Sequence, residues 1–139
     1  MSSLLALDTS VAVRLLVASH PEHGSSARWW AGRPVVLSGH AAAETYSVLT
    51  RLPGDARVTP ADAARLMTDR FGATITLSAD RVRAAPTLFA EIGVWGGAVY
   101  DGLVGLAAAD NDAELATCDA RARSTYEAVG ARVVLVPSG

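Results

Sequence analysis

The sequence contains no lysine, because all 12 of its basic residues are arginines. This absence excludes enzymes that form a Schiff base through a lysine amine. It also excludes P-loop nucleotide hydrolases, which hold phosphate with a lysine, and phosphoaspartate enzymes that depend on a lysine.

Cysteine is almost as scarce, since Cys118 is the only one. A single thiol cannot form an internal disulfide or supply a zinc cluster, and it fits a reducing compartment. The longest stretch without a charged residue is ten residues, 34–43, whereas a membrane span needs about 20. The N-terminal residues also lack the basic region of a secretory signal. We therefore expect a soluble, cytoplasmic protein without a membrane partner.

The composition is that of a globular chain. The 139 residues are 50% hydrophobic and 19% charged, which argues against disorder and predicts one domain over residues 1–139. The 12 basic and 14 acidic residues give a net charge of -2. This balance does not indicate the strongly basic surface that is usual for nucleic-acid-binding proteins.

Short apolar runs alternate with helical patterns along the chain. We expect strands at residues 4–7, 35–37, 74–77, 115–118 and 133–136. We expect helices, the first of them capped by Ser10, at residues 11–18, 25–31, 40–51, 60–71, 79–93, 99–109 and 120–129. This alternation predicts an α/β fold with a mainly parallel central sheet and helices on both faces.

Two acidic residues lie where predicted strands end. Asp8 follows the strand at 4–7, and Asp119 follows the strand at 115–118, more than a hundred residues later. In parallel α/β sheets, ligands bind outside the carboxyl ends of the strands. We therefore expect both carboxylates at the same edge of the sheet.

Two further acids fall in helices. Glu44 lies in the helix at 40–51, and Asp101 opens the helix at 99–109, each on a face of small and apolar residues that leaves room beside the carboxylate. Acids in apolar surroundings are costly unless a cation or hydrogen-bond donors neutralise them.

Each acid alone also has a structural interpretation. Asp8 and Asp119 could cap the helices that follow them, and Asp101 could interact with the dipole of its helix. Glu44 has no such role in view, because Arg51 lies two turns away, too far for an i,i+4 ion pair. The conjunction of the four acids favours a functional site.

Converging carboxylates without histidine or cysteine form an oxygen-only site, which suits Mg²⁺ or Mn²⁺ better than Zn²⁺. Such sites usually act on phosphates, since the ions bridge phosphate oxygens and lower the pKa of an attacking water. The sequence leaves open whether one or two ions bind.

These motifs resemble the PIN-domain family, and within it the VapC-type toxins of bacterial toxin–antitoxin pairs. They are LALDTS at residues 5–10, Glu44 in the third predicted helix, Tyr100-Asp101, and LATCD at residues 115–119. The resemblance implies a PIN-like three-layer fold and a metal-dependent endoribonuclease that cuts RNA. It also implies a cognate VapB-like antitoxin and a homodimer.

Carried over to this sequence, the resemblance assigns the catalytic, metal-binding carboxylates to Asp8, Glu44, Asp101 and Asp119. The carboxylates or metal-bound waters would be oriented by the hydroxyls of Thr9, Ser10 and Thr117. Two interpretations are open for a set of four arginines: they contact the RNA backbone, or they are ordinary surface charges. The four are Arg14, Arg51, Arg121 and Arg123.

Histidines and tryptophans have more ordinary interpretations. We expect surface or capping positions for the three histidines, His20, His23 and His40. We expect one residue of the Trp29-Trp30 pair in the core and the other at an interface. Trp95 is a candidate for an exposed functional loop, although core packing is the preferred expectation.

Two other classes of function compete with a nuclease. A receiver domain or a haloacid-dehalogenase-like phosphatase also has aspartates at strand ends, but both normally need the lysine that is missing here. A catalytically silent PIN-like module that binds RNA or a protein is the remaining alternative, and the presence of all four acids argues against it.

Overall fold

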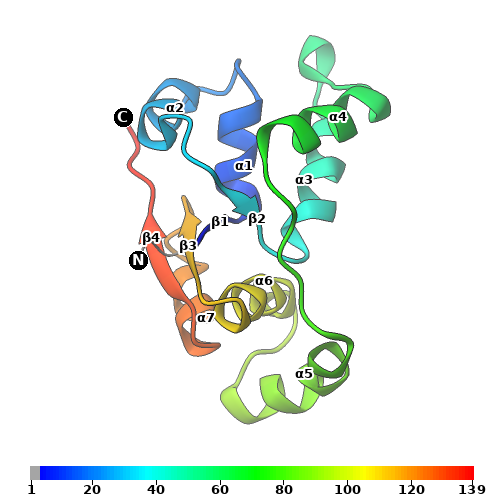
Figure 1. Ribbon diagram of the computed structural model, residues 1–139, viewed down its shortest axis with the longest axis vertical. Coiled ribbons are helices and arrows are strands. Elements are labelled where there is room, and N and C mark those ends of the chain that lie inside the picture. Colours follow the sequence, from blue (N-terminus) through cyan, green and yellow to red (C-terminus); the bar gives the residue numbers. More distant parts are fainter. Residues whose placement is uncertain (1–3) are drawn as a thin grey trace.

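A computed structural model describes residues 4–139 and has a parallel sheet of four strands at its centre. In spatial order the strands are β2 (Val36–Leu37), β1 (Leu4–Leu7), β3 (Ala113–Thr117) and β4 (Arg132–Leu135) (Figure 1). Leu7 lies opposite Ala116 in the register, and Ala116 lies opposite Val134. The carboxyl ends of these strands therefore meet at one edge of the sheet.

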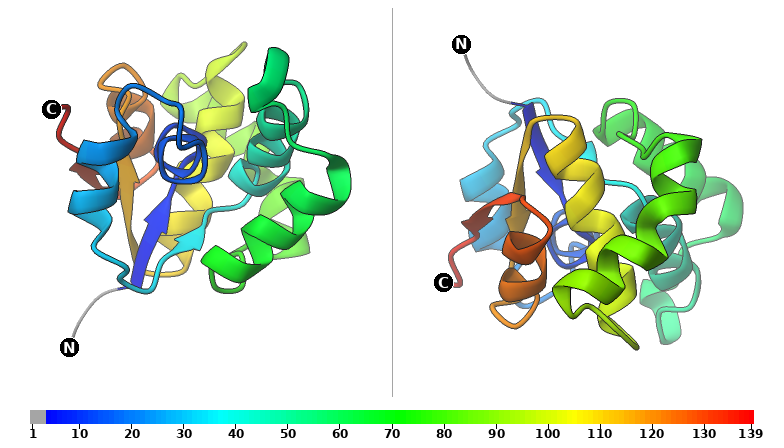
Figure 2. Two further views of the ribbon diagram at one scale, coloured as in Figure 1. Left: turned by 90° about the horizontal axis from the view of Figure 1, so that it is seen from above. Right: turned by 90° about the horizontal axis from the view of Figure 1, so that it is seen from below.

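Helices cover both faces of the sheet, as the sequence predicts (Figures 1 and 2). They are α1 (Thr9–Leu16), α2 (His23–Trp30), α3 (Ala41–Thr50), α4 (Pro60–Arg70), α5 (Ala79–Ile92), α6 (Ala98–Asp110) and α7 (Arg123–Ala128), with a short 3₁₀ helix η1 (Gly54–Ala56) after α3. One face carries α1 and α2, and the other carries α6 and α7, with α5 against the outer side of α6. The expected three-layer α/β architecture is confirmed.

Two hydrophobic cores lie against opposite faces of the sheet, because side chains alternate along each strand. On β3, Leu115 belongs to the core that contains Val104 of α6 and Tyr126 of α7. The next residue, Ala116, belongs to the core that contains Val11 of α1. Leu115 and Ala116 are both fully buried, as expected for a central strand between two helical layers.

The expected strand at residues 74–77 is wrong. Only Ile75 pairs with the sheet, through an isolated parallel bridge to Ser38. The neighbouring edge strand, β2, is just two residues long. Strand β2 is therefore too short to form regular strand pairing with residues 74–77, although the β-branched residues of this segment favour a strand.

Three helices, α1, α2 and α7, begin at residues clearly different from the expected 11, 25 and 120. Asp8, and not Ser10, caps α1, because its carboxylate accepts a hydrogen bond from the Val11 N–H at 3.2 Å. The last helix begins at Arg123, because Asp119 accepts a hydrogen bond from the Arg121 N–H within a turn that precedes the helix.

The tryptophans divide differently from the expectation. Trp29 and Trp30 are both half-buried and pack against the core beneath α1 and α2. Trp95 is 81% exposed, so the preference for core packing is wrong at this position. It lies in the turn between α5 and α6, where Gly93 and Gly96 have positive φ values of 79° and 61° and redirect the chain.

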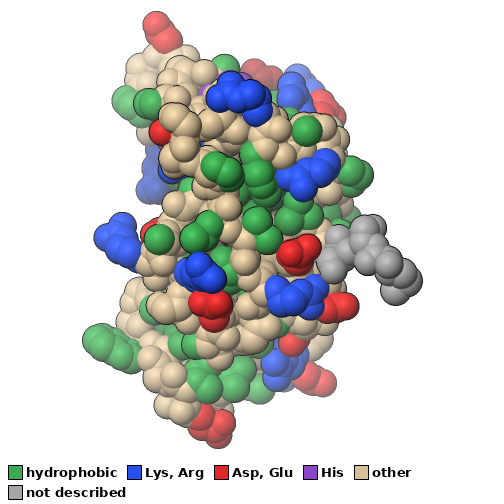
Figure 3. Space-filling model, turned by 90° about the vertical axis from the view of Figure 1, so that its left-hand side faces the viewer, with side chains coloured by type: hydrophobic (Ala, Val, Ile, Leu, Met, Phe, Trp, Pro, Cys, Tyr) green, Lys and Arg blue, Asp and Glu red, His purple; other side chains and the backbone are tan. Residues whose placement is uncertain are grey.

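Charges are mixed on the side of the molecule where β4 lies. Arginine and acidic side chains are interspersed there without forming a single basic surface (Figure 3). Among them Arg132 forms an ion pair with Asp112 at 2.8 Å. Within residues 4–139, no helix is both long and apolar enough to cross a membrane.

Two glycines of α6 lie where neighbouring elements approach closely. A Cβ atom at Gly105 would lie 2.7 Å from Cγ2 of Val129 and 3.1 Å from Cα of Tyr126. A Cβ atom at Gly102 would lie 3.0 Å from Cζ of Phe89 on α5. The small residues of α6 thus allow α5 and α7 to approach closely, and α7 occupies the space beside Gly105.

We predict that Gly105→Ala lowers the free energy of unfolding by about 1–2 kcal/mol, because overpacking against α7 outweighs the higher helix propensity of alanine. Urea unfolding measures the change. Gly97→Ala, at the start of the same helix, is the matched control, because nothing lies within 4 Å of its added Cβ and its φ is -63°. Equal stabilities of the two variants would contradict the prediction.

Candidate functional site

Four acidic side chains from different parts of the chain line one pocket of about 80 Å³. Asp8 directly follows β1, and Asp119 lies two residues beyond β3. Glu44 and Asp101 lie in the first turns of α3 and α6. The fold therefore brings together the four acids that the sequence singles out.

Hydrogen bonds around the end of β2 fix the helices that carry these acids. The Ser38 N–H donates to the carbonyl of Leu7 at 3.2 Å, and the Ser38 hydroxyl donates to the carbonyl of Val104 in α6 at 2.7 Å. The Thr9 hydroxyl donates to the carbonyl of Ala41 at 3.4 Å. These bonds hold the starts of α1 and α3 and the middle of α6 around the pocket.

Asp8 is buried and accepts four hydrogen bonds, which we call the Asp8 network. Its Oδ1 accepts from the Ser10 hydroxyl at 2.6 Å and from the Val11 N–H at 3.2 Å. Its Oδ2 accepts from the Thr117 hydroxyl at 2.6 Å and from the Tyr126 hydroxyl at 2.8 Å. These four donors compensate the buried charge of Asp8 and fix the orientation of its carboxylate.

The hydroxyls that bind Asp8 also position the segment after β3. Ser10 Oγ accepts a hydrogen bond from the Cys118 N–H at 2.9 Å, and Thr117 Oγ1 accepts one from the Asp119 N–H at 3.0 Å. Thr9 lines the pocket too, but its hydroxyl donates to a backbone carbonyl. The structure therefore gives Ser10 and Thr117 carboxylate-orienting contacts that it does not give Thr9.

Tyr126 lines the pocket, and the sequence analysis missed it. Burial raises the pKa of Tyr126 far above its ordinary value, and the negative charge of Asp8 raises it further, so the hydroxyl remains a donor. The approach of α7 at Gly105 places the ring within reach of Asp8. The one available signal is general: a buried tyrosine hydroxyl usually has a hydrogen-bond partner.

Asp101 and Glu44 contrast with Asp8. Among the described residues, neither carboxylate has a hydrogen-bond or ion-pair partner. Burial raises the pKa of the half-buried Asp101, and the charges of Asp8, Asp119 and Glu44 raise it further. The pocket thus holds negative charge that no side chain lining it neutralises.

The possible metal-ligand atoms in the pocket fit a hard divalent cation. They are carboxylate and hydroxyl oxygens, and no nitrogen or sulfur ligand is among the lining residues that the structure describes. Within residues 4–139, no group of three or more His, Cys, Asp or Glu side chains is placed to hold a metal ion unaided. Mg²⁺ does not need such a cage, because it is usually bound through one or two carboxylates and retains several waters.

The four candidate arginines lie outside this pocket, all within the described residues. Arg121 is nearest, because its Nε lies 3.7 Å from Asp119 and its side chain is 95% exposed. Arg123 pairs with Glu127 at 3.3 Å. Arg14 donates to the Ser138 hydroxyl at 3.4 Å, and Arg51 is exposed at the end of α3.

None of the three histidines lines the pocket, and two of them bind backbone groups. His20 Nδ1 accepts a hydrogen bond from the Glu22 N–H at 3.0 Å, and His23 Nδ1 donates to the Arg14 carbonyl at 2.8 Å. His40 is exposed and stacks on Tyr100. The expected capping and surface positions are confirmed.

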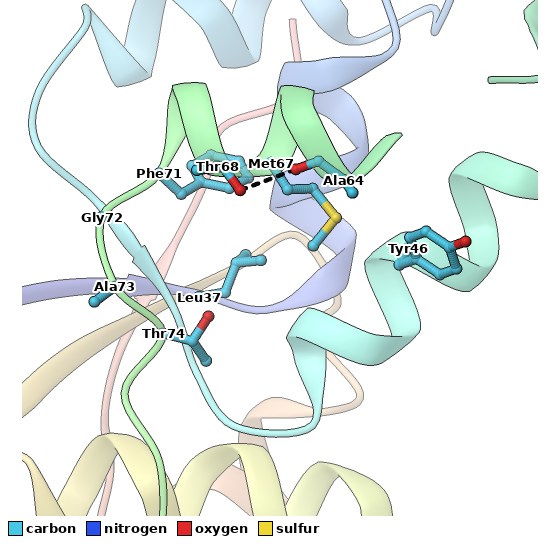
Figure 4. A pocket seen from close by; sticks show the side chains of 9 residues that line it. All are labelled: Leu37, Tyr46, Ala64, Met67, Thr68, Phe71, Gly72, Ala73 and Thr74. Carbon is cyan, nitrogen blue, oxygen red and sulfur yellow. Dashed lines mark hydrogen bonds between the residues drawn. The ribbon is translucent and has the colours of Figure 1, made fainter. Parts of the chain in front are cut away.

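A larger hollow of about 500 Å³ lies between α3 and α4 (Figure 4). Met67 of α4 and Phe71, which directly follows α4, lie over Leu37, and Tyr46 borders the hollow from α3. No acid, arginine or histidine is among the lining residues that the structure describes, so this hollow offers no comparable chemistry.

We predict that Tyr126→Phe lowers the free energy of unfolding by about 2 kcal/mol, the usual contribution of a hydrogen bond to a charged group. The loss arises because Oδ2 of Asp8 keeps only one donor. Denaturant unfolding of Tyr46→Phe, an exposed tyrosine on α3, is the control. A similar change in both variants would show that the Asp8 contact contributes nothing.

We predict that Asp101→Asn stabilises the metal-free protein at neutral pH. The raised pKa of Asp101 means that the folded state binds this proton more tightly than the unfolded state, so stability falls as pH rises through the folded pKa. Asparagine removes that loss, and the gain disappears at about pH 3, where Asp101 is protonated in both states.

Thermal melts in EDTA at the two pH values test this, with Asp69→Asn on the exposed surface of α4 as control. A gain for Asp101→Asn that is equally large in acid would count against electrostatic repulsion as its cause.

Known proteins share both the sequence and the fold. The PIN domain family matches residues 5–128. Ribonuclease VapC27 of Mycobacterium tuberculosis (strain ATCC 25618 / H37Rv) is 56% identical over 135 residues, covering 97% of this chain and 98% of its own. Ribonuclease VapC40 of M. tuberculosis (strain CDC 1551 / Oshkosh) is 41% identical over 134 residues, covering 96% and 99%.

A solved structure of similar fold is a chain of FitAB bound to an IR36 DNA fragment, with a TM-score of 0.66 and 18% identity over 95% of this chain and 94% of that one. At this identity the likeness concerns the fold alone. The family match and the two relatives, which align over nearly their full lengths, lead to one conclusion: the chain belongs to the PIN domain family and, within it, to the VapC group.

Proposed function

We propose that this protein is a Mg²⁺- or Mn²⁺-dependent endoribonuclease toxin that hydrolyses RNA phosphodiester bonds. The observation that carries the proposal is the convergence of Asp8, Glu44, Asp101 and Asp119 on one pocket. The similarity of this chain to two proteins named as ribonucleases, over 96% or more of its length, supports the same activity here.

The proposed cation ligands are the four carboxylates of Asp8, Glu44, Asp101 and Asp119. When bound, Mg²⁺ or Mn²⁺ supplies activation of a water and neutralisation of phosphate charge.

The chain itself contributes preorganisation. The Asp8 network fixes the orientation of one carboxylate before any ligand binds. Thr117 links that carboxylate to the backbone of Asp119, so these two acids would keep a constant relative position. Asp101 and Glu44, which have no partner among residues 4–139, would adjust to the cation.

RNA would lie across the pocket with its phosphates near arginine. Arg121 is the best placed of the four candidates, because its exposed side chain lies beside Asp119. We also propose contacts to the RNA backbone, further from the acidic pocket, for Arg14, Arg51 and Arg123. Phosphate contacts of this kind fix the position of the RNA without reading its sequence.

We also propose the partners that a VapC-type toxin requires. They are a cognate VapB-like antitoxin, which would cover the acidic pocket, and a second copy of this chain in a homodimer. The similarity to VapC27 and VapC40 supports both. The lone Cys118 is consistent with a cytoplasmic location.

A catalytically silent PIN-like module remains the second candidate. It is favoured by one observation, that within the described part of the chain no three ligand side chains form a ready-made metal cage. Such a module would bind RNA or a protein partner without any requirement for the four acids.

We predict that the purified protein cuts RNA in Mg²⁺, that EDTA abolishes the cutting, and that Asp101→Asn lowers the rate by roughly a hundredfold or more. Asp101 is the variant of choice, because no hydrogen bond of the fold depends on its carboxylate within the described residues. Rates on total cellular RNA, with circular dichroism to verify folding, provide the measurement.

Asp69→Asn is the matched control, because it changes the same residue type on the exposed surface of α4. Cleavage that persists in EDTA or in Asp101→Asn would overturn the proposed mechanism. Binding of RNA without cleavage under all conditions would favour the silent module.

A further inference from the structure

Two aromatic rings stack on each other at the starts of α3 and α6. The ring centroids of His40 and Tyr100 are 5.1 Å apart, and the ring planes make an angle of 29°. Both side chains are exposed, and Tyr100 is exposed to 56%. Neither the Tyr100 hydroxyl nor the His40 ring nitrogens have a hydrogen-bond partner among residues 4–139. The pair therefore presents aromatic surface that the described part of the fold does not use.

Each ring is tied by its helix to one of the pocket acids. Tyr100 directly precedes Asp101 in α6, and Val104, one turn further on, lines the pocket. His40 precedes Glu44 by four residues, which places both on the same side of α3. The stacked pair thus joins the first turns of α3 and α6, the turns that carry Glu44 and Asp101, although neither ring lines the pocket itself.

The starts of these two helices leave their backbone N–H groups without a side-chain cap. No side chain caps either α3 or α6, whereas the side chains of Asp8, Thr59 and Ser78 cap α1, α4 and α5. The partial positive charge at a helix N-terminus attracts anions. Because Glu44 and Asp101 lie in these same first turns, the field would favour a phosphate once a cation bound by the acids offsets their charge.

We propose that His40 and Tyr100 form a stacking platform for an unpaired nucleobase next to the phosphate that is cut. This inference rests on the proposed ribonuclease function. Single-stranded RNA is recognised largely by stacking its bases on aromatic side chains, which is open to every base because each has a π-face. The platform selects unpaired over paired RNA at this position, and it leaves the choice of base to other contacts.

Within the pair, Tyr100 is the residue that touches the base, and His40 supports its other face as a positioning residue. Two other exposed aromatics do not share this place. Tyr46 borders the hollow between α3 and α4, and Trp95 lies in the turn between α5 and α6. Neither lies in the first turn of α3 or α6, the turns that carry Glu44 and Asp101.

The test uses fluorescein-labelled single-stranded RNA of about nine nucleotides, a length that covers one binding groove. A series of probes carries one abasic site, moved by one nucleotide at a time. Fluorescence anisotropy measures binding to Asp101→Asn, which keeps the probe intact. We expect one abasic position to weaken binding about tenfold, the usual effect of losing one base stack. In the double variant with Tyr100→Leu, this position dependence disappears.

Conservative and matched variants distinguish the loss of base stacking from a general loss of RNA binding. Tyr100→Phe keeps the ring and should retain the position dependence, as should Tyr46→Leu, which removes an exposed tyrosine elsewhere on α3. His40→Ala should reduce the dependence without abolishing it. In a background with Asp101 intact, Tyr100→Leu should raise KM for single-stranded RNA about tenfold and leave kcat within twofold, because the stack contributes to binding.

The outcomes distinguish this inference from the function on which it rests. If the wild-type protein cuts RNA and the same abasic position remains critical in Tyr100→Leu, the platform is overturned and the nuclease stands. If the wild-type protein neither cuts nor binds the probes, the nuclease fails and the platform with it. Loss of the position dependence in Tyr100→Leu alone supports the platform.

Discussion

The arrangement of the site depends on the burial of one carboxylate. A buried charge is costly unless hydrogen bonds replace its water, and Asp8 receives four of them. The donors come from Ser10 and Val11 of α1, Thr117 of β3 and Tyr126 of α7. The network therefore joins the first strand and helix to elements more than a hundred residues away, and it positions the rest of the pocket around a fixed acid.

Two of the other three carboxylates differ from Asp8 in this respect. Asp101 and Glu44 have no donors among the described residues, and burial, followed by repulsion from the other acids, raises the pKa of Asp101. One acid thus receives its hydrogen bonds from the fold and keeps its orientation, whereas two others have no partner among the described residues. The exposed rings of His40 and Tyr100 stack on each other at the starts of the two helices that carry these unpartnered acids.

Much of the fold could be predicted because local patterns are strong. Leu4–Leu7 forms a strand with the expected bounds, and the Thr59-Pro60 start and the Ser78 cap place α4 and α5 correctly. Failures occurred where a local preference lacked a tertiary partner or competed with a stronger one. The segment 74–77 has the β-branched composition of a strand but adjoins an edge strand of two residues. Ser10 is a good cap by type, but Asp8 takes that role.

The sequence by itself determined which acids meet, because the carboxyl ends of parallel strands converge and each acid occupies a definite place in its element. It also determined the hard, oxygen-only character of the site. Only the tertiary structure decided that Tyr126 binds Asp8, across 118 residues, and that His40 stacks on Tyr100. Contacts of this kind depend on the packing of helices against one another, as at Gly105, and they leave no periodic trace along the chain from which they could be inferred.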